Sequence, residues 1–184
     1  MHKRHIFLTG FMGAGKSRVG RQLAARLNFP FVDTDKEIEK KTNLSIKEIF
    51  ETQGEPAFRR LEREVIAQLC DDPLARVISL GGGALNDAQT FRRVHETGVV
   101  VYLKSSPEHI LQRVKHTDKR PLLQVAAGQD RDRLLLRRIE ELLAQREPIY
   151  ARADIIIQRD GLEAEEAAER ILGELQDWWG KSNA

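Results

Sequence analysis

The feature that most constrains this chain is the octapeptide GFMGAGKS, residues 10–17, which directly follows the apolar run IFLT. It matches the pattern G-x-x-x-x-G-K-[S/T] in register, with a strand-like run before it and a helix-like run after it. Glycines allow the backbone to turn its N–H groups toward an anion, and the positive end of the following helix adds to the attraction. The sequence therefore predicts a loop that binds the phosphates of a nucleotide.

The side chains at the end of this loop have expected tasks. Lys16 is placed to reach the terminal phosphates, and the hydroxyl of Ser17 is placed to ligate Mg²⁺. The alternative, a plain glycine turn between a strand and a helix, is disfavoured because the pattern and its context agree. The residues predicted to bind ATP at this loop are Gly13, Ala14, Gly15, Lys16, Ser17 and Arg18.

Short runs rich in β-branched residues alternate with longer helical patterns along the chain. Nearly continuous apolar runs are typical of parallel strands that are buried on both faces. Their alternation with helices predicts a βαβ series, and so an α/β fold with a five-stranded parallel sheet flanked by helices in three layers. The predicted strands are residues 5–9, 29–33, 76–80, 99–103 and 154–158, and the predicted helices are residues 16–27, 35–41, 45–52, 55–70, 130–145 and 162–179.

Composition and charge narrow the class of protein. With 184 residues the chain is expected to form a single domain, and its net charge of +2 argues against a nucleic-acid partner. No signal peptide and no apolar run of membrane-spanning length is evident, so we expect a cytoplasmic protein without a membrane partner. Cys70 is the only cysteine and is expected to be a buried residue at the end of a helix. The five histidines have no metal-ligand spacing and are expected on the surface or in loops.

Two carboxylates follow the second predicted strand in the sequence VDTD, at Asp33 and Asp35. Ligands of open α/β sheets bind beyond the carboxyl ends of the strands, and alternate residues of an extended segment point to the same side. Asp33 is expected either to hold Mg²⁺ through a water or to accept a proton from an attacking hydroxyl, and Asp35 to bind hydroxyls of a substrate. The alternative is that one of them, Asp35 for instance, only caps the following helix.

Two arginines and a glycine triplet lie farther along the chain. Arg59 stands beside the apolar stripe of its predicted helix, three residues before Glu62, so it is expected to reach into a cleft or else to be a solvated surface charge. Arg146 continues the apolar face of its helix, and an arginine there needs an anionic partner, either a carboxylate substrate or a structural acid. The triplet at 81–83 follows the third strand and permits close approach of a ligand to the backbone, or else forms a strained turn.

The ordered set of motifs resembles that of the shikimate kinase family. GFMGAGKS, DTD, FRRLE, GGG, KRPLL and REPIY occur in the family's order and at its usual spacing, between about His5 and Ile157. The resemblance implies the P-loop fold of nucleoside monophosphate kinases. It also implies transfer of the γ-phosphoryl group of ATP to the 3-hydroxyl of shikimate, on the pathway to aromatic amino acids.

The resemblance also implies roles for particular residues. Shikimate would be held by Asp35, by the arginines Arg59 and Arg146 on its carboxylate, and by the backbone at Gly81 and Gly82. Catalysis would rest on Lys16, Asp33 and Arg120, with one Mg²⁺ per site held by Ser17 and Asp33, and with Arg113 and Arg120 also contacting ATP.

The resemblance divides the chain as well. Residues 33–72 would be a helical substrate-binding insertion and residues 114–125 a lid, while residues 1–32, 73–113 and 126–184 would form the core of a monomeric kinase. Two features depart from the commonest family pattern: Arg18 stands where Thr is frequent, and QRDGLEA, residues 158–164, is hard to align with the family's adenine-contacting loop.

Other functions stay open at this stage. Another small-molecule kinase of the same fold, such as a gluconate kinase, would share the phosphate loop and a lid but would not predict two arginines on one carboxylate. A nucleotide-gated binding module would hydrolyse ATP or GTP without an acceptor, yet no effector or guanine-reading motif is evident. An RNA-binding protein is disfavoured by the low net charge and by the lack of a stacking aromatic motif.

Overall fold

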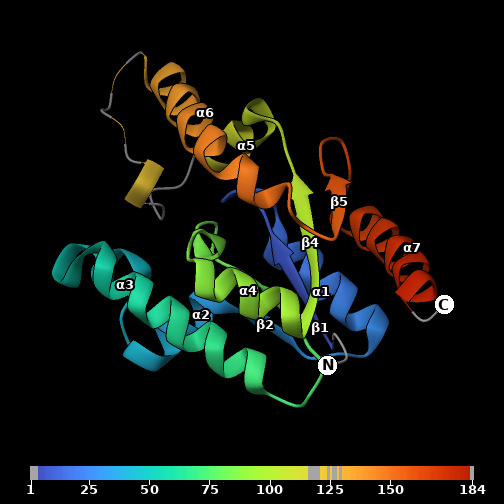
Figure 1. The fold of residues 1–184 in the computed structure, drawn as a ribbon. Coiled ribbons are helices and arrows are strands. Elements are labelled where there is room, and N and C mark those ends of the chain that lie inside the picture. Colours follow the sequence, from blue (N-terminus) through green and yellow to red (C-terminus); the bar gives the residue numbers. More distant parts are fainter. Residues whose placement is uncertain (1–3, 116–120, 124, 126–127, 129, 183–184) are drawn as a thin grey trace.

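The computed structural model describes residues 4–115, 121–123, 125, 128 and 130–182 and confirms the predicted α/β fold (Figure 1). All strand pairings are parallel, and the strand order in the sheet is β2-β3-β1-β4-β5. Each predicted strand is present, although three are shorter than expected; the second begins only after Pro30, which lacks the N–H that a ladder requires. The strands are β1 (His5–Thr9), β2 (Phe31–Asp33), β3 (Val77–Ser79), β4 (Gly98–Lys104) and β5 (Ile155–Gln158).

The helices connect these strands. Two of them, at residues 88–97 and 107–114, were not among the helices predicted from the sequence, and several of the others differ from the prediction at their boundaries. The two helices predicted at 45–52 and 55–70 form one element with a kink at Gly54, where φ is 80°. The helix predicted to end at residue 145 continues through Pro148 to Tyr150. The helices are α1 (Lys16–Leu27), α2 (Thr34–Thr42), α3 (Ile46–Asp71), α4 (Ala88–Thr97), α5 (Pro107–Val114), α6 (Arg131–Tyr150) and α7 (Ala164–Ser182), with short 3₁₀ turns at Ala84–Asn86 and Pro121–Leu123.

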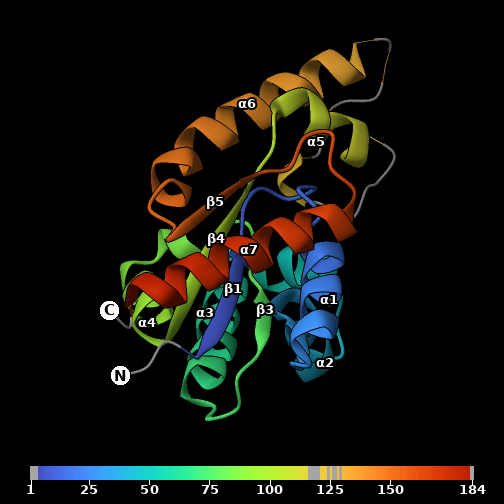
Figure 2. The same cartoon turned by 90° about the vertical axis from the view of Figure 1, so that its right-hand side faces the viewer.

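The three central strands, β3, β1 and β4, are buried on both faces, as their apolar sequences predict, whereas the edge strand β5 has one exposed face, on which Ile156 is 49% exposed. Ile6 and Leu8 of β1 pack in the cluster that contains residues of α1 and α7, whereas Phe7 between them packs toward α3 and α4. Figure 2 shows α1 and α7 on the same side of the sheet. Because all the strands are parallel, their carboxyl ends, and the loops that follow them, lie at one edge of the sheet.

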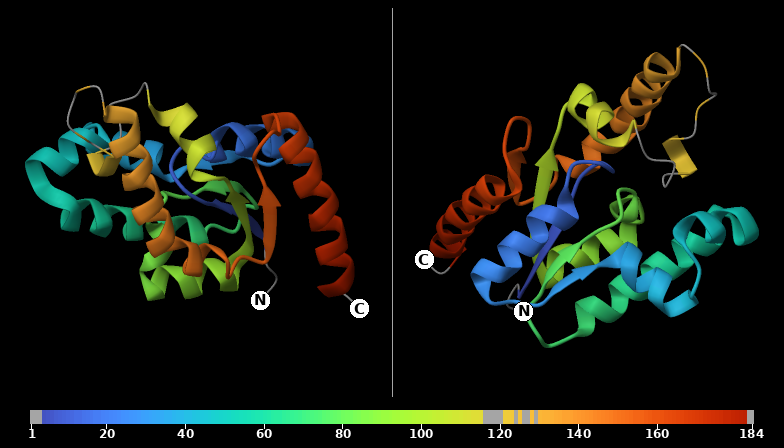
Figure 3. Two further views of the ribbon diagram at one scale, coloured as in Figure 1. Left: turned by 90° about the horizontal axis from the view of Figure 1, so that it is seen from above. Right: turned by 180° about the vertical axis from the view of Figure 1, so that it is seen from behind.

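Two helical regions extend beyond the sheet at that end. The pair α2 and α3 has its own apolar cluster, which includes Ile38, Ile49 and Phe58. On the opposite side α5 and α6 pack on each other around Ile110 and Ile139. Figure 3 shows the first half of α3 and the helices α5 and α6 on either side of the loop that precedes α1. The loop that precedes α1 therefore lies between two helical regions, each packed around its own apolar cluster.

Two single residues test the expectations from composition. Cys70 is buried near the end of α3, as predicted. The prediction for the histidines is wrong for His5, which lies in the central strand β1 and is 1% exposed. Its burial lowers the pKa of its imidazole. In the part of the chain that the structure describes, no helix combines the length and apolarity that crossing a bilayer requires.

Candidate functional site

The loop between β1 and α1 has the backbone that its glycines predict. Gly10, Gly13 and Gly15 have backbone φ values of 137°, 88° and 88°, which residues with a Cβ atom rarely adopt. A Cβ at Gly10 would also lie 2.7 Å from the carbonyl oxygen of Leu103. Gly15 is the N-cap of α1 and has no side chain with which to cap it. The N-terminal end of α1 therefore has no side-chain cap, which suits the binding of an anion.

Lys16 is held inside this loop. Its side chain is 9% exposed, and Nζ donates to the carbonyl oxygens of Gly10 at 2.8 Å and Phe11 at 3.1 Å. The ammonium is thus positioned over the concave side of the loop by the loop itself. This arrangement suits the predicted task, because a positioned cation needs little reorganisation when phosphate binds.

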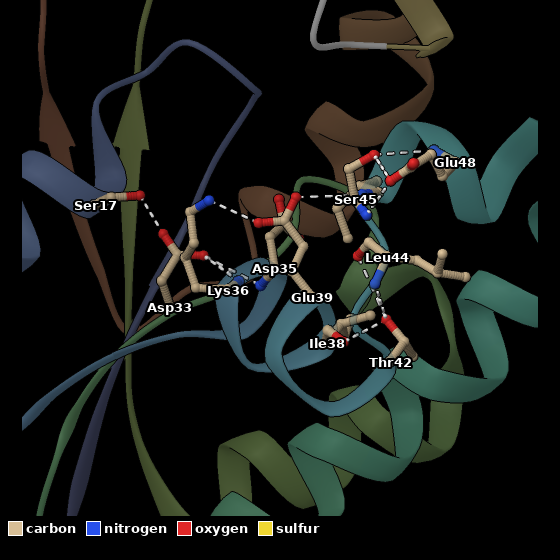
Figure 4. A network of polar contacts seen from close by, with 11 residues as sticks. Ser17, Asp33, Asp35, Lys36, Ile38, Glu39, Thr42, Leu44, Ser45 and Glu48 are labelled. Carbon is tan, nitrogen blue, oxygen red and sulfur yellow. Dashed lines mark hydrogen bonds and ion pairs between the residues drawn. The ribbon is translucent and has the colours of Figure 1, made fainter.

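Ser17 and Asp33 meet at the end of the loop (Figure 4). The hydroxyl of Ser17 donates to Oδ2 of Asp33, while Oδ1 of Asp33 accepts from the backbone N–H of Asp35 at 3.1 Å and of Lys36 at 3.4 Å. Asp33 is therefore the N-cap of α2, and the alternative that Asp35 caps this helix is wrong. Two hard oxygen donors side by side at a phosphate loop fit Mg²⁺, which takes few protein ligands and several from phosphate and water.

Asp35 reaches the site by a different route from the one predicted. It lies in the first turn of α2 and not on an extended strand end, so alternation along a strand does not place it. The preceding Thr34 is fully buried and joins α2 to the third strand: its hydroxyl donates to the carbonyl of Ser79 at 3.2 Å and accepts from the N–H of Gly81 at 3.1 Å. This link brings Asp35 against the glycine triplet.

A recess lies beside the phosphate loop and holds about 450 Å³ of space, which includes open solvent at its mouth. Its floor is the triplet 81–83, and its apolar wall includes Phe50 and Phe58, whose ring centroids are 5.0 Å apart across the kink of α3. A hydrogen bond of 3.2 Å from the N–H of Ile46 to Glu39 fixes the start of α3 against α2 (Figure 4). The recess is lined by Met12, Asp35, Ile46, Phe50, Phe58, Arg59, Glu62, Gly81, Gly82, Gly83, Leu122 and Arg146.

Each glycine of the triplet gives space to a polar side chain. A Cβ on Gly82 would lie 3.3 Å from Nη1 of Arg146, and one on Gly83 would lie 2.8 Å from Nη2 of Arg59. A Cβ on Gly81 would collide with Oε1 of Glu62. The triplet therefore allows the two predicted arginines and one acid to approach the backbone at the same place.

Arg146 is 5% exposed, and its guanidinium stands 5.5 Å from the ring centroid of Phe11. Nη1 has no hydrogen-bond partner among the residues that the structure describes. Next to it the hydroxyl of Tyr150 donates to the carbonyl of Gly82, and burial raises the pKa of that phenol to about 12. A buried guanidinium with a spare donor at the floor of a recess is suited to an anionic ligand.

Arg59 is placed by two carboxylates. Its Nη1 donates to Glu62 at 2.7 Å and its Nη2 to Glu55 at 2.9 Å, and its side chain is 22% exposed. Glu62 was not among the predicted site residues, although it stands three residues after Arg59 on the same helix. Its side chain is 3% exposed, and burial raises the pKa of its carboxyl group against the opposing effect of Arg59. Only the fold reveals that this acid faces inward.

The remaining predicted residues lie around the nucleotide end of the loop. Arg113 on α5 approaches Gly15, since a Cβ there would lie 2.7 Å from its Nη1. Arg18 is exposed on the first turn of α1, as expected. Arg120 lies outside the described residues, as does half of the segment predicted to be a lid, so its role stays a prediction.

Comparisons with known proteins point to one family. The family model described as Shikimate kinase matches residues 12–176. The chain is 42% identical to a shikimate kinase of Thermodesulfovibrio yellowstonii over 94% of this chain and 95% of the relative. It is 44% identical to a shikimate kinase of Thermus thermophilus over 92% of this chain and 89% of the relative.

A solved structure agrees with these matches. The shikimate kinase from Acinetobacter baumannii in complex with shikimate superposes with a TM-score of 0.87 and 37% identity, over 95% of this chain and 93% of that one. The phosphate loop, the recess with its two arginines and these full-length matches lead to one conclusion: the chain belongs to the shikimate kinase family.

Proposed function

We propose that this shikimate kinase binds shikimate in the recess and ATP along the phosphate loop, and transfers the γ-phosphoryl group from one to the other. The kinase activity and ATP as co-substrate follow from the family. The observation that carries the assignment of the recess is Arg146, a buried guanidinium whose Nη1 faces a glycine floor without a protein partner among the described residues. Such a group calls for a carboxylate from the ligand.

In this proposal the recess positions the acceptor. Arg146 and Arg59 bind the carboxylate of shikimate, and Asp35 accepts hydrogen bonds from its hydroxyl groups. Gly82 supplies a backbone N–H and close approach. Gly81 supplies close approach alone, because its own N–H already donates to Thr34. Holding two reactants in line is worth several kcal/mol of barrier, up to roughly 7–11 in the best cases.

The phosphate loop supplies charge. Lys16 lies against the terminal phosphates, and Ser17 with Asp33 holds one Mg²⁺, which when bound neutralises charge on the phosphate oxygens. We assign Asp33 to the metal, through a water, because one of its oxygens already caps α2 and the other contacts Ser17. No cluster of three or more His, Cys, Asp or Glu ligands gathers within the described ranges, in keeping with an ion bound largely by phosphate and water.

The remaining assignments are part of the same proposal. Arg113 lies along the nucleotide, and Arg120 closes onto the phosphates from a lid formed by residues 114–125. Residues 33–72 act as the substrate-binding part, and the rest of the chain as the core. We propose that the enzyme works as a monomer in the cytoplasm, where reducing conditions suit a chain with a single, buried cysteine.

A coupled assay of ADP release tests the proposal. The protein is given ATP and Mg²⁺ with shikimate, with gluconate or without an acceptor. We expect release that depends on shikimate, at least about 100-fold above the other two conditions. Gluconate also has a carboxylate and hydroxyl groups, but its open chain does not hold a hydroxyl group in line with the γ-phosphate while the arginines bind the carboxylate. Equal release with gluconate, or release that needs no acceptor, would refute the assignment of the recess.

A further inference from the structure

A buried arginine outside the recess has no role in the function proposed above. Arg159 directly follows β5 in the segment that resists alignment with the family, and it is 2% exposed. Its Nε and Nη1 have no hydrogen-bond partner among the described residues. Burying a cation without a partner is costly, so such a group indicates a ligand that supplies the missing charge.

The backbone around Arg159 is held firmly in place. Its N–H donates to the carbonyl of Lys104 at 2.7 Å, extending the pairing of β4 with β5. Its carbonyl accepts from the N–H of Leu162 at 3.2 Å across a turn in which Gly161 has φ 74°. Asp160 accepts from the N–H of Ser106 at 3.0 Å. The loop is thereby tied to the start of α5, beside which it lies in Figure 2.

The guanidinium of Arg159 lies against the phosphate loop. A Cβ built on Gly15 would be 3.7 Å from its Nε and 3.8 Å from its Nη2, and 2.7 Å from Nη1 of Arg113. Two cations therefore flank the N-terminal end of α1, whose dipole is also positive. Burial first, and then Arg113, lower the pKa of Arg159 against the opposing effects of Glu163 and Asp160, so these acids compensate its charge only in part.

The loop has two sides, and they differ. A Cβ on Gly82, at the floor of the recess, would lie 3.4 Å from the backbone nitrogen of Met12 and 3.5 Å from the carbonyl oxygen of Gly10. That side faces the acceptor, while Gly15 faces Arg159. Because the γ-phosphate must meet the acceptor, the α-phosphate lies toward Gly15. This step rests on the proposed function.

We propose that Arg159 binds the α-phosphate of the nucleotide and so sets the affinity for ATP and ADP without acting in the chemical step. An α-phosphate supplies the anion that two spare N–H donors and a neighbouring guanidinium require. The ribose and the base carry no charge and do not compensate the pair. The ligand is therefore a nucleoside di- or triphosphate, recognised through its α-phosphate.

The main test is Arg159→Gln, with Arg170→Gln on the exposed face of α7 as the control that removes the same charge elsewhere. Binding of ADP and of adenosine is measured by calorimetry or by displacement of a fluorescent ATP analogue. We expect the Kd of ADP to rise roughly ten- to hundredfold, the value of one or two charged hydrogen bonds. For Arg159→Gln, the Kd values of adenosine and shikimate should stay within about twofold of the wild type. For the control variant, the Kd of ADP should do so as well.

The thermal midpoint of the free protein separates a ligand-binding role from a structural one. Removing a buried charge that lacks a partner leaves Tm unchanged or raises it, whereas removing a structural contact lowers it. Should Arg159→Gln fail to fold, Arg159→Lys keeps the test open. Pyrophosphate is then expected to raise the Tm of the wild type more than that of the lysine variant, because lysine lacks the guanidinium fork.

An unchanged Kd for ADP in Arg159→Gln, an equal loss for adenosine, or equal Tm shifts with pyrophosphate would each overturn the proposal. If the wild-type protein binds ADP tightly but forms no ADP from ATP when shikimate is added, the proposed function is refuted instead. The two failures are distinguishable because ADP binding is measured without an acceptor.

Discussion

The phosphate loop and the recess are neighbours, but they are built in opposite ways. The loop consists of consecutive residues, and its lysine is held by carbonyls five and six positions away in the chain. The recess takes Asp35 from α2, Arg59 from α3, a glycine triplet after β3 and Arg146 from α6. A local motif thus binds what all such kinases share, whereas the acceptor is chosen by residues that only the fold brings together.

The largest effect is expected at Lys16. Lys16→Ala should lower turnover by about 10²–10³-fold or more, because it removes a positioned cation from the place where charge develops. The fold should persist, since the ammonium of Lys16 is held by backbone carbonyls of the loop and does not pack in an apolar cluster of the core. Turnover and circular dichroism are compared with Lys40→Ala, an exposed change on α2. Near-normal turnover would contradict the assignment of the loop.

Arg146→Lys tests whether the recess depends on geometry as well as on charge. The variant keeps the charge but loses the planar fork, so kcat/KM for shikimate should fall about 100-fold while the KM for ATP stays within about twofold. Arg137→Lys on the exposed face of the same helix is the matched control. Equal losses for both substrates would mean that Arg146 does not belong to the acceptor side.

A smaller effect is expected at Arg59. Arg59→Lys should raise the KM for shikimate about tenfold, because Arg59 is more exposed than Arg146 and is already shared between Glu55 and Glu62. The lysine variant is preferable to alanine, which would leave Glu62 buried without its cation. Steady-state kinetics with each substrate varied in turn measure the effect. An unchanged KM for shikimate would remove Arg59 from the site.

The smallest effect concerns pH and Glu62. Burial raises the pKa of Glu62 above its value in the unfolded chain, so the folded state holds this proton more tightly. Glu62 therefore adds to the free energy of unfolding, relative to Glu62→Gln, when it is protonated. This contribution is complete below the pKa of the unfolded chain, about 4.3, and is lost as the pH rises through the pKa of the folded state. The wild-type Tm minus the variant Tm should therefore be larger at about pH 4 than at about pH 8 by a few degrees. A difference that grows with pH would mean that Arg59 outweighs burial.

The parallel sheet and the phosphate loop could be predicted because their signals are local. An apolar run buried on both faces specifies a strand, and GFMGAGKS specifies both its backbone and its ligand. The ends of helices were harder to predict where the helix contains a residue that usually interrupts one. Gly54 interrupts α3 without ending it, and Pro148 near the end of α6 is accommodated within the helix.

The site was predictable to the extent that side-chain direction followed from helical spacing. Arg146 continues an apolar stripe, so its inward direction could be read from the sequence. Asp35 lines the recess, but the geometric reason for expecting it there is wrong, since a helix begins one residue before it; its predicted contact with substrate hydroxyls stays a prediction. Glu62 and Arg159 are charged residues whose burial depends on neighbours far along the chain.

Sequence patterns were enough to predict the five strands, most of the helices, the phosphate loop and, through the spacing of the motifs, the family. Those properties depend on residues close together in the chain, or on their order along it. Only the tertiary structure decided that Asp33 and not Asp35 caps α2, that three glycines make room for two arginines and an acid, and that Arg159 lies against Gly15. The reason is physical: burial and charge compensation depend on which surfaces meet, and contacts between distant segments are settled only when the chain packs.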